Sequence, residues 1–169
     1  MTYNPEQHHR RSIRLKNYDY RLEGAYFVTI CTKDKECILG TIHDGTMYPN
    51  EIGKTIQSVW DDLPSRFPNI LLDYFVIMPN HVHGIIVIQK YQEGAINRTP
   101  TLGNIIRVFK AVSTQFIRKN QSPRFALQTN YYDHIIRNEK SLNEIKQYIF
   151  DNPLNWEKDE ENPLNKIGP

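Results

Sequence analysis

Hydrophobic and polar positions repeat along this chain with two different periods, one typical of strands and the other of helices. Three runs of β-branched and aromatic residues, at positions 26–32, 70–78 and 81–88, predict strands. A shorter run at positions 131–136 predicts another strand. An Asp-Gly pair at positions 44–45 lies between two short apolar segments, and it predicts a β-hairpin.

Three further segments repeat apolar residues every three or four positions, which predicts amphipathic helices. The first follows Asn50, a residue type that caps helix N-termini. The second begins near position 100, and its expected apolar stripe consists of Leu102, Ile105, Ile106, Phe109, Val112 and Phe116. The third runs from about position 138 to 150 and must stop near Asn152, because Pro153 follows. This order of elements favours an α+β fold, in which helices pack on an antiparallel sheet.

A length of 169 residues fits one domain. We expect a polar, basic arm over residues 1–23, one domain over residues 24–156, and a loosely held acidic tail over residues 157–169. The net charge of +2 excludes a uniformly basic coat but allows a local basic patch. We find no signal peptide, no membrane span and no metal-site spacing of the two cysteines, so we expect a cytoplasmic protein with reduced thiols.

His81 and His83 are the first candidates for chemistry. They lie two positions apart in a predicted strand, so both side chains point from one face and Val82 points from the other. Two such imidazoles can bind one metal ion, although a His-x-His pair in a strand is also a common incidental pattern. The rest of the strand is apolar, so buried histidines there need polar partners, and a metal ion is one of them.

Tyr148 and Asn152 lie one helical turn apart on the third predicted helix. If this helix packs over the face that carries the histidines, Asn152 can offer a carbonyl oxygen to a metal ion, with the Tyr148 phenol beside it. The alternative for Tyr148 is an aromatic residue that simply packs on the sheet. The sequence contains no glycine-rich phosphate loop, no HExxH and no acidic triad suited to two-metal catalysis.

The sequence Met-Pro-Asn-His-Val-His at residues 78–83 resembles the His-hydrophobe-His signature of the HUH nuclease superfamily. More closely, it resembles the REP-associated tyrosine transposases, relatives of the single-strand (IS200-like) transposases of small bacterial insertion sequences. The family's opening motifs are similar to residues 11–29, and its closing motifs to residues 131–138 and 148–153. The resemblance spans residues 11 to 156, and it implies a ferredoxin-like fold of the HUH single-tyrosine transposase type.

The resemblance also implies a role for each matching residue. Tyr148 falls on the nucleophile, and His81 and His83 fall on the metal ligands. Asn152 falls on a third ligand that is Gln in some relatives, although Asn is one methylene shorter. A mixed nitrogen and oxygen site implies Mg²⁺ or Mn²⁺. The implied reaction is cleavage and rejoining of single-stranded DNA through a 5′-phosphotyrosine, at sites flanked by hairpins.

Single-stranded and hairpin DNA are therefore the expected partners, and both a monomer and a homodimer fit the resemblance. The basic arm either binds phosphates or is simply solvated. The candidate phosphate contacts are Arg10, Arg11, Arg14, Lys16, Arg107, Lys110 and Lys119. Three alternatives remain open: an HUH nickase that initiates replication, a domesticated protein that binds hairpins without cutting them, and a structural metal domain.

Overall fold

The computed structural model describes residues 23–89 and 100–166. Its centre is a four-stranded sheet with strand order β4-β5-β1-β6, in which every neighbouring pair is antiparallel. The strands are β1 (Gly24–Cys31), β4 (Ile70–Ile77), β5 (His81–Ile88) and β6 (Tyr132–Ile136). One helical segment connects β1 to β4 and another connects β5 to β6, which gives the ferredoxin-like arrangement and confirms the predicted α+β fold.

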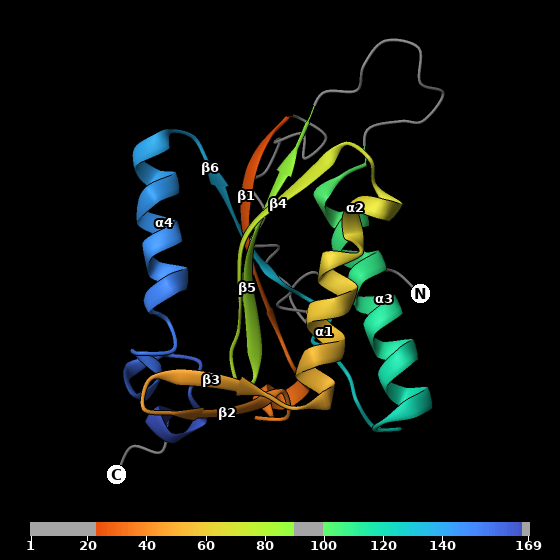
Figure 1. The fold of residues 1–169 in the computed structure, drawn as a ribbon, viewed down its shortest axis with the longest axis vertical. Helices are drawn as coiled ribbons and strands as arrows, with labels where there is room; N and C mark the ends of the chain where they lie inside the picture. Colours follow the sequence, from red (N-terminus) through yellow and green to blue (C-terminus); the bar gives the residue numbers. More distant parts are fainter. Residues whose placement is uncertain (1–22, 90–99, 167–169) are drawn as a thin grey trace, which may run out of the picture.

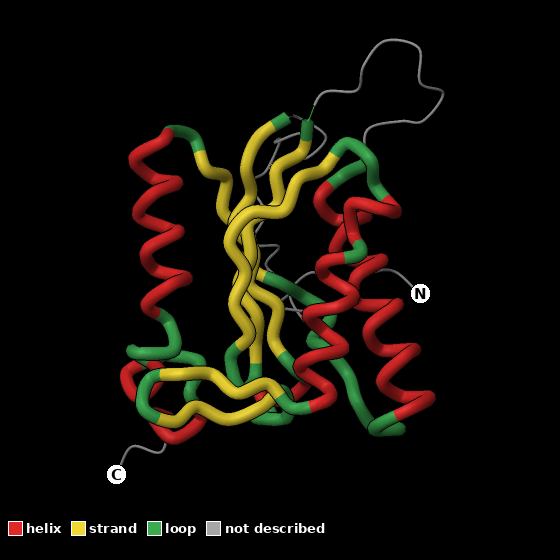
Figure 2. The backbone as a smooth tube through the Cα atoms, in the orientation of Figure 1, coloured by secondary structure: helices red, strands yellow, loops and turns green. Residues whose placement is uncertain are grey.

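Helices cover both faces of the sheet (Figures 1 and 2). On one face lie α1 (Glu51–Asp61), the short α2 (Leu63–Arg66) and α3 (Leu102–Asn120), and on the other lies α4 (Glu139–Asp151). A separate hairpin of β2 (Gly40–His43) and β3 (Thr46–Pro49) lies at one end of the molecule. Three 3-10 turns complete the described chain: Lys33–Lys35, Trp156–Lys158 and Pro163–Lys166.

Short polar side chains cap the N-termini of α1 and α4. The Asn50 side chain accepts a hydrogen bond from the Gly53 amide at 3.0 Å, as predicted for the start of α1. The Asn138 side chain caps α4 in the same way, by accepting from the Ser141 amide at 2.8 Å. Asn152 is the C-cap of α4, so the predicted stop before Pro153 is confirmed.

The larger core fills the face under α1 and α3. Trp60 stacks on Phe75 with ring centroids 4.5 Å apart, and Gly84 lets the indole lie against β5, since a Cβ there would come within 2.4 Å of it. The predicted stripe on α3 is wrong at Phe116, which is 52% exposed. Residues four positions apart lie on one face of a helix, and the positions four and eight residues after Phe109, 113 and 117, are both buried. Ile117 therefore faces the core instead of Phe116.

The smaller core lies under α4 and contains Phe27, Ile85, Ile136 and Ile149. His81 and His83 belong to this same face of β5, because they share the alternation of Ile85. The sheet and α4 therefore enclose an apolar layer that has two histidines at one end.

The chain after α4 does not form the loosely held tail that we expected. It turns beneath α4 beside the β2–β3 hairpin (Figure 1), and Asn162 is only 4% exposed. The Asn80 amide donates to the Glu161 carbonyl at 2.8 Å. The expectation is thus wrong for residues 157–166, while residues 167–169 lie outside the described part. No described helix is both long and apolar enough to cross a membrane.

Candidate active site

The two histidines face each other at the start of β5. His81 is completely buried and His83 is 3% exposed. The Nε2 atoms of the two rings lie 3.0 Å apart, and the ring planes are inclined at 67°. Strand alternation therefore brings together two imidazole nitrogens, as the spacing predicted.

Asn80 determines which nitrogen of His81 is free. Its amide nitrogen donates to the carbonyls of Lys35 and Glu161 at 3.1 and 2.8 Å, so its carbonyl oxygen is the atom that faces His81. This oxygen lies 2.8 Å from Nδ1 of His81. A carbonyl oxygen only accepts, so Nδ1 carries the proton and Nε2 keeps its lone pair. His81 is thus held as the tautomer that binds a metal ion through Nε2.

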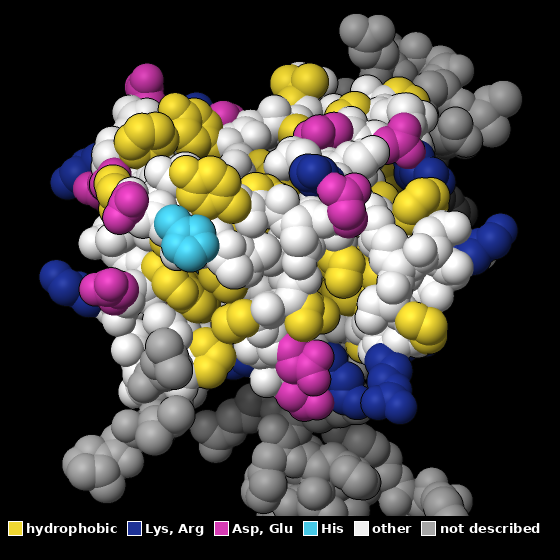
Figure 3. Space-filling model, turned by 60° about the horizontal axis from the view of Figure 1, so that its bottom comes forward, with side chains coloured by type: hydrophobic (Ala, Val, Ile, Leu, Met, Phe, Trp, Pro, Cys, Tyr) yellow, Lys and Arg dark blue, Asp and Glu magenta, His cyan; other side chains and the backbone are white. Residues whose placement is uncertain are grey.

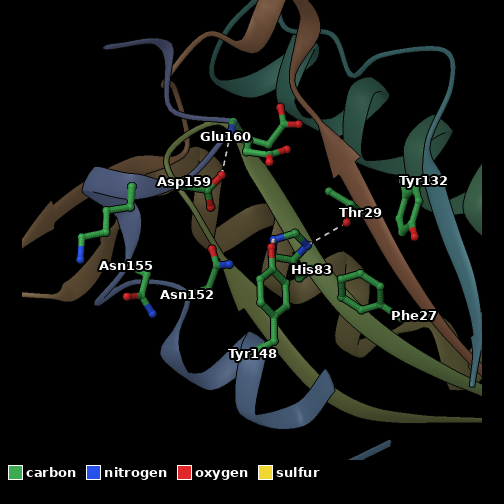
Figure 4. Close-up of a pocket in the computed structure, with 11 residues that line it drawn as sticks. Phe27, Thr29, His83, Tyr132, Tyr148, Asn152, Asn155, Asp159 and Glu160 are labelled. Atoms are coloured by element: carbon green, nitrogen blue, oxygen red, sulfur yellow. Dashed lines mark hydrogen bonds between the residues drawn. The ribbon is translucent and has the colours of Figure 1, made fainter. Parts of the chain in front are cut away.

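Thr29 positions the second ring. It is paired with His83 across β1 and β5, and its hydroxyl lies 2.8 Å from Nδ1 of that ring (Figure 4). Phe27 stacks on the same ring with centroids 5.3 Å apart. These contacts direct Nε2 of His83 toward His81 and toward α4.

Tyr148 and Asn152 reach the histidines from α4. The Tyr148 hydroxyl lies 3.4 Å from Nε2 of His83, and 51% of the residue remains exposed. Asn152 is 3% exposed, and its carbonyl oxygen is buried without a hydrogen-bond partner. Figure 4 shows Asn152 beside Tyr148 and the His83 ring. The helix therefore packs over the histidine face and places both residues where the helical spacing indicated.

The C-terminal segment adds a carboxylate that the sequence analysis missed. Oδ2 of Asp159 lies 4.0 Å from Nε2 of His81. One ligand atom from each of His81, His83 and Asp159 falls within 4.8 Å of the others. The only signal in the sequence was a run of three acidic residues at positions 159–161, in a stretch that has no apolar period.

Burial sets the charges in the site. Desolvation lowers the pKa of His81 to about 4, against the smaller opposing effect of Glu161. Desolvation also lowers the pKa of His83, and His81 adds to that effect. Both rings are therefore neutral at neutral pH, which is the form that binds metal ions.

The two oxygen acids of the site are shifted in the opposite direction. Partial burial, and then the charge of Asp159, raise the pKa of Tyr148, while the Asn152 side chain lowers it. Burial is also the main cause of the raised pKa of Asp159. The Tyr148 phenol therefore stays protonated at neutral pH unless a charge or a base assists its ionisation.

A pocket of about 770 Å³ opens in front of these side chains. Phe27, Tyr132, His83 and Tyr148 line one side, and Asn152, Asn155 and residues 158–161 line the other (Figure 4). Tyr148 thus stands at the boundary between an aromatic wall and a polar wall. The volume is in the range of pockets that hold small molecules or single residues of a polymer.

The predicted phosphate contacts that the structure describes do not line this pocket. Arg10, Arg11, Arg14 and Lys16 lie outside the described residues. Arg107, Lys110 and Lys119 belong to α3, across the sheet from the histidines.

Lys110 already has partners within the fold. It donates to the carbonyls of residues 128, 129 and 130 at 2.8 to 3.1 Å, which competes with any contact to phosphate. Among the described basic residues, the one that lines the pocket is Lys158. On the face of the molecule seen in Figure 3, basic side chains are scattered among acidic and apolar ones.

The sequence of the chain has a close counterpart. A Haemophilus influenzae protein described as "Uncharacterized protein" is 46% identical over 172 residues, which cover 94% of this chain and 96% of that protein. The chain belongs to the same family as this protein. Comparison with models of protein families finds no match.

Solved structures identify the fold. A REP-associated tyrosine transposase bound to a REP hairpin superposes with a TM-score of 0.59 and 18% identity, over 85% of this chain and 74% of that one. A proposed transposase of Deinococcus radiodurans superposes with a TM-score of 0.50 and 14% identity, over 82% of this chain and 95% of that one. This chain therefore has the fold of the REP-associated tyrosine transposases.

The residues of the site suit a divalent cation. Two neutral imidazoles present Nε2 atoms to the same point, and the buried Asn152 oxygen has no other partner. The Asp159 carboxylate adds a negatively charged oxygen beside them. Such a mixed set of nitrogen and oxygen donors fits Mn²⁺. It suits Mg²⁺ less well, because Mg²⁺ prefers oxygen ligands and two of the donors here are imidazole nitrogens.

Proposed function

We propose that this protein is a metal-dependent tyrosine nuclease and strand transferase that acts on single-stranded DNA with a hairpin. The observation that carries the proposal is the 3.4 Å contact between the Tyr148 hydroxyl and Nε2 of His83, one of two histidines that also face each other. A half-exposed phenol next to the proposed cation site can act as a nucleophile on a bound substrate. A tyrosine that only packed on the sheet would not require its hydroxyl beside the histidines. The structural likeness to a transposase bound to a REP hairpin supports the choice of DNA.

His81 and His83 would hold the cation, with oxygen from Asp159 and Asn152. When bound, a divalent cation would polarise the P–O bonds of a phosphodiester and stabilise the charge that develops on it. Asn80 and Thr29 keep the two rings in the orientation and tautomer that this binding needs.

Tyr148 supplies the nucleophile. Its oxygen attacks the phosphorus, so that one O–P bond forms to the tyrosine and the bond from phosphorus to the 3′ oxygen breaks. The phenol loses its proton, and the leaving 3′ oxygen takes one up as a hydroxyl. The products are a 5′-phosphotyrosine and a free 3′-OH. Because one phosphodiester replaces another, the 3′-OH of a second strand can reverse the step and rejoin DNA.

Tyr148 needs help to ionise, since burial and Asp159 raise its pKa. The Asn152 side chain acts in the opposite direction and favours the phenolate. We propose that Asn152, one turn along α4, both holds the phenol in place and offers its unpaired oxygen to the cation. This dual role explains why a polar residue is buried at the end of this helix.

The test is covalent capture. The full chain is incubated with a pool of labelled hairpin oligonucleotides that carry randomised single-stranded flanks, with Mn²⁺, Mg²⁺ or EDTA, and analysed on a denaturing gel. We expect a covalent adduct in the presence of a divalent ion, and we expect it to be lost in EDTA and in Tyr148→Phe. The control variant Tyr74→Phe should keep the adduct, because Tyr74 lies on the edge strand β4 and does not line the pocket. Hairpin binding without any adduct would overturn the proposal and favour a protein that only binds DNA.

A further inference from the structure

A row of side chains crosses three strands of the sheet at the level of the histidines. Thr29 on β1 is paired with His83 on β5 and, on its other side, with Tyr132 on β6. Neighbouring strands lie about 4.8 Å apart, so the backbone of Tyr132 is roughly 10 Å from that of His83. Since paired residues share a face of the sheet, Tyr132 faces the same pocket as His83.

The aromatic rings of this wall differ in their exposure. Phe27 and His83 are buried, at 7% and 3%, whereas Tyr132 is 46% exposed. The Phe27 ring meets Tyr132 edge-on, with centroids 6.3 Å apart and planes inclined at 68°. Phe27 therefore packs against the Tyr132 ring, while nearly half of Tyr132 stays exposed and the residue lines the pocket. An exposed ring held in this way is a stacking surface.

We infer that Tyr132 forms a nucleobase-binding subsite next to the scissile phosphate. The inference rests on the proposed function, because it assumes that a phosphodiester lies at Tyr148. A base attached to that phosphate can swing to one side of it, and the aromatic side of the pocket lies toward Tyr132 (Figure 4). The other side carries Asp159, Glu160 and Glu161, which offer carboxylates rather than a stacking surface.

The chemistry of this subsite predicts its selectivity. Stacking uses the π face that every base has, so Tyr132 holds the base without reading its sequence. Its ring takes a single unpaired base, whereas a paired base already stacks within its duplex. The subsite thus favours single-stranded DNA at the point of cleavage, whatever the hairpin beside it.

The experiment measures binding in a protein that cannot cut. In a Tyr148→Phe background, the affinity for the oligonucleotide selected by covalent capture is measured by fluorescence anisotropy in Mn²⁺. We expect Tyr132→Ala to weaken binding roughly 5- to 150-fold, the range for loss of one stacked base. Tyr132→Phe should bind as the parent does. Tyr74→Ala is the matched control, because Tyr74 lies on the opposite edge strand with 44% exposure and does not line this pocket.

A second set of oligonucleotides identifies the partner of Tyr132. Each base of the single-stranded flank is replaced in turn by an abasic site. One such position should weaken binding to the parent protein but cause no further loss in Tyr132→Ala. The proposed subsite would be refuted if every abasic substitution reduced the affinity of both proteins equally. It would also be refuted if Tyr132→Ala bound as tightly as the parent protein. If Tyr132→Ala does not fold, Tyr132→Leu replaces it, since leucine keeps apolar bulk but has no π face.

The subsite and the proposed function fail in different ways. If the chain forms no covalent adduct with any oligonucleotide, the nuclease proposal fails, and binding of an unselected hairpin pool to the Tyr132 variants still tests stacking. If adducts form and the Tyr132 variants bind normally, the nuclease proposal stands and the subsite is refuted.

Discussion

The Tyr148 hydroxyl lies 3.4 Å from Nε2 of His83, although the two residues are 65 positions apart in the chain. One comes from a helix that covers the sheet and the other from a central strand, so only the folded domain brings them together. Nε2 of His81 lies 3.0 Å from the same nitrogen. The Tyr148 hydroxyl and Nε2 of His81 thus both lie within 3.4 Å of Nε2 of His83, where we propose that nucleophile and cation meet.

Replacing Tyr148 with Phe should separate chemistry from stability. Removal of the hydroxyl leaves a half-exposed ring in place, so the free energy of unfolding should change by no more than about 0.5 kcal/mol. Mn²⁺ binding should persist, because the phenol is not among the proposed ligands. Thermal unfolding and calorimetric titration with Mn²⁺ check both expectations. A large loss of metal affinity in Tyr148→Phe would instead make the phenol a ligand.

Asn80 should affect metal binding although it is not among the proposed ligands. Asn80→Ala removes the acceptor that holds the proton on Nδ1 of His81, and we expect Mn²⁺ affinity to fall about 10- to 100-fold. Asn80→Asp is the matched variant, since it keeps an acceptor for His81 but loses the donors to the carbonyls of Lys35 and Glu161. If both variants lose affinity equally, Asn80 acts through the fold and not through the tautomer.

Asp159 should contribute to the affinity for the cation, whereas its neighbour Glu160 should not. Of these two residues, Asp159 is the one found in an ion-pair contact with His81, at 4.0 Å. We expect Asp159→Asn to weaken Mn²⁺ binding at least about 10-fold, while Glu160→Gln removes an equal charge with little effect. Isothermal titration of the two variants makes the comparison. Equal losses would show that general negative charge is sufficient and that Asp159 is not a ligand.

The metal-free protein should lose stability as the pH falls from about 6.5 to 4. Burial lowers the pKa of His81 from 6.5 to about 4, so in this window the unfolded chain binds a proton that the folded chain does not. At 1.36 kcal/mol per pKa unit, the loss approaches about 3 kcal/mol for this residue. The stability is fully present above pH 6.5, the pKa of the unfolded state.

Denaturant unfolding in EDTA at several pH values measures this effect. His81→Gln stays neutral, so its stability should depend less steeply on pH in the same window, whatever its absolute stability. An identical slope in wild type and variant would contradict the account. Asp159, whose pKa is raised, contributes with the opposite sign in both proteins and therefore does not create the difference.

The local geometry of the site could be predicted from the sequence because it follows from short periods. Alternation along a strand puts His81 and His83 on one face, and a helical turn puts Tyr148 beside Asn152. The cap residue Asn50 likewise indicated where α1 begins, and the α+β fold followed from the order of the elements.

The C-terminal segment could not be predicted in this way. Residues 157–166 contain no apolar period, and side-chain amides bound to backbone carbonyls hold them in place. Asn80 donates to the carbonyl of Glu161, and Asn162 donates to that of Trp156. Such side-chain to backbone contacts produce no hydrophobic periodicity in the sequence, and the position of Asp159 could therefore not be predicted. The position of Tyr132 next to Thr29 depends on strand register, which the sequence also did not specify.

The most direct test of the account is to locate the covalent bond. The adduct formed by the full chain with the selected hairpin oligonucleotide in Mn²⁺ is digested with protease and nuclease, and the remaining nucleotide-bearing peptide is sequenced by mass spectrometry. The account predicts a 5′-phosphate on the oxygen of Tyr148 and a free 3′-OH on the released strand. Attachment to any other residue, or cut DNA with no protein bound to it, would contradict it.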